Sequence, residues 1–210
     1  MPRRFEGKWT SASNKARAVR RPFLETVMKT YEFSLVLKNV SINTPDLEDK
    51  LFESGCDDSL VCSYVETVYL EFDRESDSLE SAIISAIYDV EKSGLGAKVK
   101  SVDAGDYVGI SDIATLANSS KQAIALLKDG KRGPGQFPSP VQRLTGKQPL
   151  WRWGEVAKWL YENDRADSEL AINAEVIENI NIALELREPM KCAQVFNFVH
   201  AINEQATSLA

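Results

Sequence analysis

The chain has 210 residues, with 25 basic and 31 acidic side chains and a net charge of −6. Hydrophobic residues make up 43% and charged residues 27%, which excludes a wholly disordered chain, a collagen-like chain and a coiled-coil rod. No apolar run approaches the ~18 residues of a membrane span, and the first residues lack a signal-peptide pattern. We therefore expect a cytoplasmic protein with no membrane partner.

The charge is unevenly distributed along the chain. Residues 1–30 carry a net +6, residues 31–102 carry −9, residues 103–163 carry +2 and residues 164–210 carry −5. Such asymmetry bears on the choice of partners more than the total does. The acidic total therefore does not exclude nucleic acid binding by the two basic segments.

Cysteine and histidine are too few for most metal or nucleophilic sites. Cys56, Cys62 and Cys192 are the three cysteines, and no CxxC pair occurs. A disulfide framework or a zinc site is not expected, and a reducing compartment fits best. The single histidine, His200, lies in a helical stretch and is interpreted as a surface or packing residue. No cofactor and no metal are expected.

Residues 1–30 show little periodicity and many basic side chains, which predicts a flexible arm. Such an arm would lie along a phosphate backbone without reading bases. The alternative is that translation begins at Met28, since strand-like sequence starts just after it.

Residues 31–103 are predicted to form a small α+β domain. Alternation of apolar and polar residues predicts four strands, at about 31–37, 59–63, 68–73 and 97–102. Thr44 and Pro45 are suited to begin a first helix that stops at Gly55. Asp77 and Glu80 resemble a capping box at the start of a second, longer helix. The order β-α-β-β-α-β is that of the ferredoxin-like split unit.

Two acidic runs lie in this domain, Asp57-Asp58 and Asp73-Arg74-Glu75. They admit a metal site or an acid–base pair, but no third partner is indicated, and loop carboxylates are usually solvated. Repulsion of DNA from this face, or contact with a protein, is the favoured interpretation.

A helix-turn-helix spacing occupies residues 106–163. The first helix, within 108–117, carries Ala114 where a second helix would cross closely. Asn118 follows four residues later, and asparagine tolerates the left-handed conformation that such a turn needs. The second helix would extend to Lys128. Two packed core helices joined by an asparagine turn would give the same spacing.

The second helix should present one face outward. Ser119 or Ser120 would cap it, and Ile124 and Leu127 would face the core. The outer face then carries Ser120, Lys121, Gln122 and Ala125. Side chains of this kind reach base edges and phosphates in the major groove.

The residues after this helix predict a basic loop and a wing. Residues 128–135 are basic and glycine-rich, and the prolines that follow cannot continue a helix. Residues 141–144 and 150–153 can pair around a turn as a two-stranded wing. A third helix would open at Gly154-Glu155, with a buried stripe below it.

Four runs in this segment resemble the excisionase-like, MerR-related winged helix-turn-helix proteins. They are Ile113-Ala114, GKRGPG at 130–135, FPxP at 137–140 and WRWxEVxxW at 151–159. The whole stretch 31–161 is similar to bacterial proteins described only as helix-turn-helix domain-containing. In those proteins a GCDD run and an FDRE run, here at 55–58 and 72–75, precede the DNA-binding segment.

The resemblance covers about two thirds of the chain. It implies a winged DNA-binding fold for the second part and carries no function for the ferredoxin-like part. Asn118 departs from the usual glycine of the turn, and the last 45 or so residues match nothing in the family.

The tryptophans and the basic loop each have two interpretations. Trp151, Trp153 and Trp159 are able to stack on bases, but burial in the core of a small domain is favoured. Arg152 should then point away from its neighbours, toward solvent or phosphate. The Lys131-Arg132 pair is either a solubilising turn or a phosphate contact, and its place after the second helix favours the contact.

The residues expected to contact DNA are Ser119, Ser120, Lys121, Gln122, Ala125, Lys128, Lys131, Arg132, Gly133, Arg143, Lys147 and Arg152. Lys121 and Gln122 are the candidates for base or phosphate readout. The residues assigned to the phosphate backbone are Lys131, Arg132, Arg143, Lys147 and Arg152.

Residues 164–210 are predicted to form two amphipathic helices, broken at Glu188-Pro189. Either they form a helical hairpin that makes a homodimer, or they pack onto the domains of the same chain. A dimer would suit a regulator, because two-fold symmetry matches inverted-repeat operators. Cys192 is interpreted as a buried hydrophobic residue.

The leading hypothesis is a sequence-specific double-stranded DNA-binding protein, a bacterial transcriptional regulator that reads the major groove with the helix at about 119–128. The alternative is a protein-interaction or ligand-sensing module that acts through the acidic domain and the C-terminal helices. The third is an excisionase-like architectural DNA-binding protein. An enzyme is not expected, since no nucleophile–base pair or phosphate loop is present.

Overall fold

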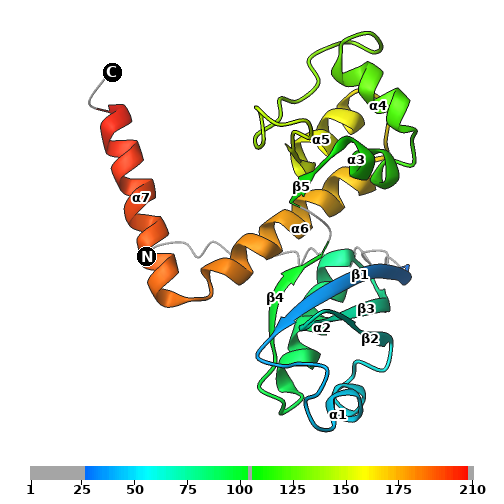
Figure 1. The fold of residues 1–210 in the computed structure, drawn as a ribbon, viewed down its shortest axis with the longest axis vertical. Helices are drawn as coiled ribbons and strands as arrows, with labels where there is room; N and C mark the ends of the chain where they lie inside the picture. Colours follow the sequence, from blue (N-terminus) through cyan, green and yellow to red (C-terminus); the bar gives the residue numbers. More distant parts are fainter. Residues whose placement is uncertain (1–26, 104–105, 208–210) are drawn as a thin grey trace, which may run out of the picture.

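The computed structural model describes residues 27–103 and 106–207 (Figure 1). These residues form a mixed α+β fold with a four-stranded antiparallel sheet, a two-stranded ribbon and seven helices. The predicted basic arm lies outside the described residues up to residue 26, and its last two residues, Lys29 and Thr30, belong to the first strand. None of the described helices combines the length and the apolar character needed to cross a membrane.

The first unit contains the larger sheet. Its elements are β1 (Lys29–Lys38), α1 (Leu47–Glu53), β2 (Ser59–Tyr64), β3 (Thr67–Ser76), α2 (Leu79–Lys92) and β4 (Lys98–Val102). The strands lie in the order β2-β3-β1-β4, and every neighbouring pair is antiparallel. Because period-2 alternation puts one set of side chains on one face, Leu35 and Leu70 are fully buried. The rings of Phe33 and Phe72 stack with centroids 5.2 Å apart.

Both predicted helix starts in this unit are displaced. Helix α1 begins at Leu47, because Asp46 takes a left-handed conformation, with φ of 55°, just before it. The Thr44 hydroxyl instead accepts the backbone N–H of Ser41 at 2.9 Å and closes a turn. Helix α2 is capped by Ser78, whose hydroxyl accepts the N–H of Ser81, and not by Asp77. Serine and aspartate are equally good caps, so the pattern alone did not separate them.

The second unit packs five short elements around tryptophans. They are β5 (Tyr107–Val108), α3 (Ile110–Leu116), α4 (Lys121–Lys128), β6 (Trp151–Arg152) and α5 (Trp153–Glu162). β5 pairs with β6, which brings Val108 opposite Trp151. Its core contains side chains from every one of these elements, including Ile113, Ile124 and Leu160.

Helix α6 (Ser168–Leu186) joins the two units (Figure 1). Its N-terminal half contributes Ala174 to the tryptophan core, and its C-terminal half contributes Ile180 to the sheet core. Asn181, next to Ile180 on this helix, is buried between the two cores. Its amide oxygen accepts the N–H of Val102 at 2.8 Å, and its amide nitrogen donates to the Val102 carbonyl at 3.1 Å and to the Asp106 carboxylate at 3.1 Å.

An ion pair holds the C-terminal end of α6 to the first unit. Arg187 donates two hydrogen bonds to the Glu91 carboxylate, at 2.6 and 2.7 Å, and Lys98 adds a third at 3.0 Å. These contacts, the Arg187 bonds first, lower the pKa of Glu91 to about 2. The carboxylate therefore stays ionised and anchors the last turn of α6 over the end of α2.

The predicted C-terminal hairpin does not form. Helix α6 packs on its own chain, whereas α7 (Pro189–Thr207) leaves it at a sharp angle and projects from the body (Figure 1). Phe196 and Phe198 are 65% and 69% exposed. Cys192 is half-buried at the base of α7 rather than in a core, which corrects its expected burial. The reason is that the buried face of α6 is already occupied by both units.

The two hydrogen bonds between the Asn181 amide and the backbone of Val102, which we call the amide clamp, predict a measurable loss of stability when the amide is removed. Asn181→Ala would leave the N–H and C=O of Val102, which is 2% exposed, without partners, at a cost of about 2–3 kcal/mol. Urea denaturation of the full chain measures this loss. Asn179→Ala, at an exposed position of the same helix, is the matched control and should change the free energy of unfolding by less than about 0.5 kcal/mol. Equal effects of the two substitutions would contradict the clamp.

Candidate nucleic-acid interface

The turn between α3 and α4 has the geometry that the spacing predicts. Asn118 has φ of 44°, in the left-handed region. The N–H of Ser119 then donates to the Ala114 carbonyl at 2.7 Å. The Ser120 hydroxyl accepts the N–H of Ala123 at 3.1 Å, so Ser120 and not Ser119 caps α4. This cap orients the first turn of α4.

Helix α4 is buried along one side only. Ile124 and Leu127 are 1% and 3% exposed and face the tryptophan core. Lys121 and Gln122 lie in the first turn and are exposed, and no acidic residue shares that turn. Ala125 is half-buried, so it contributes less outer surface than predicted. The exposed surface of α4 is therefore polar, with a positive charge at its N-terminal end.

The glycine-rich loop closes the C-terminal end of α4. The N–H groups of Lys131 and Arg132 both donate to the Leu126 carbonyl, at 2.9 and 3.1 Å. Gly133 follows with φ of +82°, and a side chain there would meet Leu127 at 3.0 Å. Glycine is thus required by the close approach of the loop to the helix. These backbone contacts hold Lys131 and Arg132, whose side chains are exposed, at the C-terminal end of α4.

A further basic residue, which the sequence analysis did not include, lies at the same place. Arg165 follows α5, and its guanidinium lies 3.1 Å from the position that a Gly133 Cβ would occupy. A hollow of about 250 Å³ between α4 and the end of α5 is lined by Arg165, Arg132 and Ser119, among others. Arg165 comes 32 residues after Gly133 in the chain, and no local pattern connects the two.

The basic residues differ in how far they are neutralised within the chain. Lys128 pairs with Asp129, and this contact is the main cause of the lowered pKa of the Asp129 carboxyl. Lys131 lies 3.7 Å from the same carboxylate. In the part of the chain that the structure describes, Lys121, Arg132 and Arg165 form no ion pair. Lys128 is therefore a weaker candidate for phosphate contact than predicted.

The predicted two-stranded wing is reduced to one bridge. Gln142 pairs with Leu150, through hydrogen bonds of 3.0 and 3.2 Å, and the pairing ends there. Arg143 takes a left-handed conformation with φ of 55°, which turns the chain out of the strand. Trp151 is drawn into the core instead, where it is 1% exposed and its indole N–H donates to the Pro138 carbonyl at 2.9 Å. The loop tip still exposes Arg143 and Lys147.

Arg152 is paired within the chain, which makes it a weaker candidate for phosphate contact. Its guanidinium bonds the Glu178 carboxylate on α6 at 3.0 Å and lies over the Tyr107 ring at 5.6 Å. The alternation argument predicted correctly that it points away from the tryptophans, but the surface it meets there is α6. Arg152 thus joins the second unit to the connecting helix.

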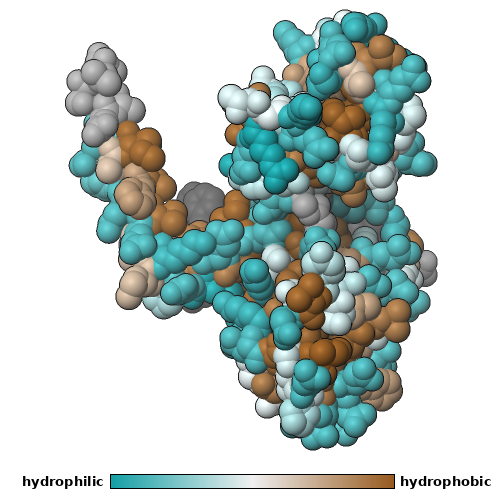
Figure 2. Space-filling view, viewed as in Figure 1, coloured by the Kyte–Doolittle hydropathy of each residue, from teal (hydrophilic) through white to brown (hydrophobic). Residues whose placement is uncertain are grey.

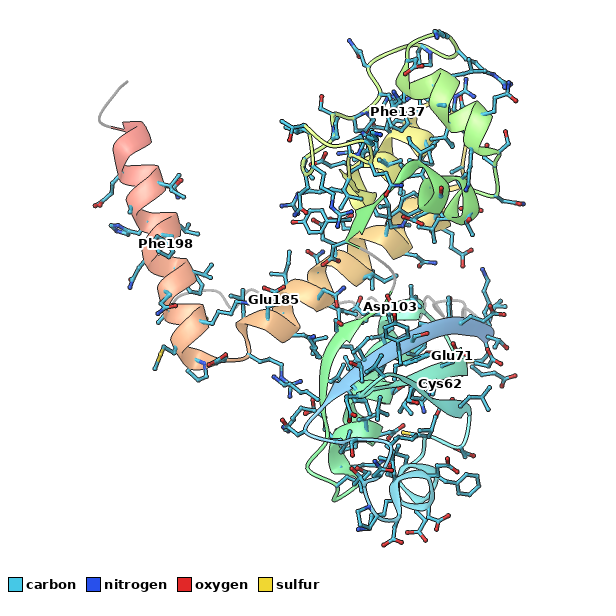
Figure 3. All side chains as sticks on the ribbon, viewed as in Figure 1. Cys62, Glu71, Asp103, Phe137, Glu185 and Phe198 are labelled. Carbon is cyan, nitrogen blue, oxygen red and sulfur yellow. The ribbon has the colours of Figure 1, made fainter. Side chains whose placement is uncertain are left out.

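The three tryptophans of this unit belong to the core, as favoured from the sequence. Trp151, Trp153 and Trp159 are between 1% and 8% exposed. The Phe137 ring packs edge-on against Trp159, with centroids 5.1 Å apart, and lies at the centre of the upper unit (Figure 3). These rings are therefore not available for stacking on bases.

One arginine of the two acidic runs is buried, and its acidic partners are Asp58 of the first run and Asp89 of α2. Arg74, 7% exposed, donates to Asp58 at 2.7 and 2.8 Å, to Asp89 at 2.8 Å and to the Gly55 carbonyl at 2.6 Å. Residues of the GCDD and FDRE runs thus form a structural ion-pair network. Within the described ranges, no group of three or more His, Cys, Asp or Glu side chains is arranged to hold a metal ion.

The thiol beside this network is inert. Cys56 is 3% exposed, and its burial raises the pKa of the thiol to about 11. A thiol that stays protonated is a poor nucleophile. His200 is exposed on α7 and lies 3.2 Å from Glu204, so its interpretation as a surface residue is correct.

Comparison with known proteins gives no assignment. No family model matches the chain, and no curated protein or solved structure is significantly similar to it. The function must therefore be argued from the geometry of the site.

The turn at Asn118 predicts a specific ranking of substitutions. Asn118→Gly should leave the thermal stability within about 0.5 kcal/mol of the parent, because glycine adopts positive φ freely. Asn118→Val should cost about 1–2 kcal/mol, because a β-branched residue is strained there. Thermal unfolding followed by circular dichroism measures both. A valine variant as stable as the glycine variant would contradict the assigned turn geometry.

Proposed function

We propose that the protein binds double-stranded DNA in a sequence-specific manner and regulates transcription in the bacterial cytoplasm. One observation carries the proposal. Helix α4 is capped and oriented by a tight left-handed turn, is buried on one side by Ile124 and Leu127, and exposes Lys121 and Gln122 in a first turn without acidic residues. A helix held in this way can enter the major groove with its N-terminal residues against base edges.

We further propose that the first unit is a ferredoxin-like domain and the second a winged helix-turn-helix. The sheet order β2-β3-β1-β4, with α1 and α2 as crossovers, supports the first assignment. The α3–α4 pair, the ribbon of β5 and β6 and the extended loop around Gly146 support the second. The resemblance to excisionase-like proteins is consistent with it and adds the expectation of a bacterial regulator.

Backbone contacts are assigned to the basic groups that the chain leaves unpaired or weakly paired. Lys131, Arg132 and Arg165 lie at the C-terminal end of α4, and Arg143 and Lys147 lie at the loop tip. Groups at the end of a recognition helix and on a neighbouring loop would hold it in the groove, because phosphates line both sides of the groove. Gly133 permits close approach of the backbone, and Ser119 lines the hollow next to Arg132.

Substitutions of residues assigned to phosphate and of residues assigned to base edges should have different effects. Lys131→Ala with Arg132→Ala should weaken binding to every sequence and reduce the slope of log K against log salt by about 2. Gln122→Ala should change the sequence preference and cost about 1–3 kcal/mol at the preferred site only. Fluorescence anisotropy with the preferred and a scrambled duplex, over a salt series, separates the two effects.

A matched control removes two positive charges that are already paired. Arg152 contacts Glu178, and Lys158 lies 3.9 Å from Glu162. Arg152→Ala with Lys158→Ala should leave the salt slope within about 0.3 of the parent's. If the Lys131 and Arg132 variant and the Gln122 variant both bound DNA like the parent, the proposed orientation of α4 would be wrong.

A second candidate function is supported by a separate observation. The exposed apolar side chains of α7 favour a protein contact, so an interaction module remains the alternative. It would be preferred if the full chain bound no duplex at low salt. A second copy of the chain is the partner that also fits regulation, since a two-fold dimer matches an inverted-repeat operator.

A further inference from the structure

Helix α7 presents an apolar face that the rest of the described chain leaves uncovered. Phe196, Phe198 and Ile202 are 65–69% exposed, and Val195 and Val199 are at least a third exposed. Figure 2 shows apolar side chains along this helix, which projects from the body, and Figure 3 shows Phe198 far from both units. Contact between α6 and α7 is limited to the region of the bend. Exposed apolar surface of this kind marks an interaction site.

The apolar residues follow a coiled-coil register. Cys192, Val195, Val199 and Ile202 are spaced by three, four and three residues, as the seam positions of a heptad are. Phe196 lies beside this seam on one side, and Phe198 lies beside it on the other. We call these six residues the α7 seam. The opposite side of the helix carries small or polar residues, among them Ala193, Gln194, Asn197 and Ala201.

Charge limits the kind of partner that the seam accepts. The charged residues of α7 and its one histidine are Lys191, Glu204 and His200, and none is among the six seam residues. Lys191 lies on the same flank of the helix as Phe198, seven residues before it. Lys191 is paired with Glu185 of α6, and Glu204 lies near His200 on the same helix. A charged partner would find no complementary group on the seam. An identical uncharged seam meets no like-charge repulsion there, which favours a second copy of the chain.

The area is also sufficient for self-association. Pairing two α7 seams would remove roughly 1,100 Å² of surface in total, counting aromatic and aliphatic side chains at their exposed fractions. This value clears the roughly 1,000 Å² that a biological interface needs and lies just below the standard size, as is typical of weak association, and we expect a dissociation constant in the micromolar range. Helix α7 projects from the body, so most of its length lies away from the two folded units (Figure 1).

We infer that the protein forms a two-fold homodimer by pairing the α7 seams of two chains. The inference stands on α7 alone. Its consequence rests on the proposed function: a dimer would present two α4 helices to the two halves of an inverted repeat. Linking two half-site contacts would then raise affinity for a repeat by a factor on the order of 10² over a single half-site.

The test is the molar mass of the full chain without DNA, by light scattering at about 50 μM, well above a micromolar dissociation constant. The parent should have twice the 23.4 kDa of the chain. Phe196→Glu with Val199→Glu should halve the measured mass to that of one chain. The matched control, Asn197→Glu with Ala201→Glu, adds the same charges on the opposite side of α7 and should keep the dimer.

Three results would overturn the inference: a monomeric parent, a dimeric seam variant, or equal loss of the dimer in seam variant and control. Circular dichroism of both variants gives their helix content for comparison. A failure of the proposed function would be separate, since it would leave the mass unchanged. A dimer that binds no duplex at low salt would contradict the DNA-binding proposal alone.

Discussion

The arrangement of the molecule depends on one side-chain amide. Asn181 lies at the open edge of β4. Its amide oxygen accepts from the N–H of Val102 and its amide nitrogen donates to the C=O of Val102, as the backbone of a neighbouring strand would. The same amide nitrogen donates to the carboxylate of Asp106, which directly precedes β5. The clamp thereby closes the sheet edge, satisfies a buried backbone pair and holds the start of the second unit. Helix α6 is consequently the element through which the orientation of α4 relative to the sheet is defined.

This connection explains why the charges are distributed as they are. Three acidic groups of the first unit have structural roles: Asp58 and Asp89 pair with buried Arg74, and Glu91 anchors α6. Acidic Glu178 on α6 neutralises Arg152. Within residues 27–103 and 106–207, Lys121, Arg132 and Arg165 around α4 form no ion pair. A protein with a negative total can therefore present one cationic surface, and its weak overall attraction to DNA would favour specific over nonspecific contact.

Local patterns predicted most of the elements. Alternation located the four strands of the sheet, and helical spacing located α2 and the buried stripe of α5, because both depend on which residues face a core. Asn118 was predicted at the turn, and Ser119 or Ser120 at the cap, since only a few residue types fit those backbone conformations. The displaced start of α1 came from Asp46, whose left-handed conformation has no clear signal in the sequence.

Contacts between distant residues escaped prediction. Asn181 interrupts an apolar helix without any periodic signature, and its partner Val102 lies 79 residues away. Arg152 looked available for phosphate because Glu178 comes from a helix whose docking was not known. Arg165 was missed for the same reason. The wing was predicted to be longer than it is, because the burial of Trp151 in the core outweighed local strand pairing.

The central claim is that α4 reads a specific duplex sequence while the surrounding cations bind phosphate. The most direct measurement is selection of bound fragments of genomic DNA by the full-length protein at two salt concentrations. The account predicts enrichment of one short motif that persists at the higher salt, while total recovered DNA falls steeply. Enrichment of no motif at either concentration, or recovery that does not depend on salt, would contradict it.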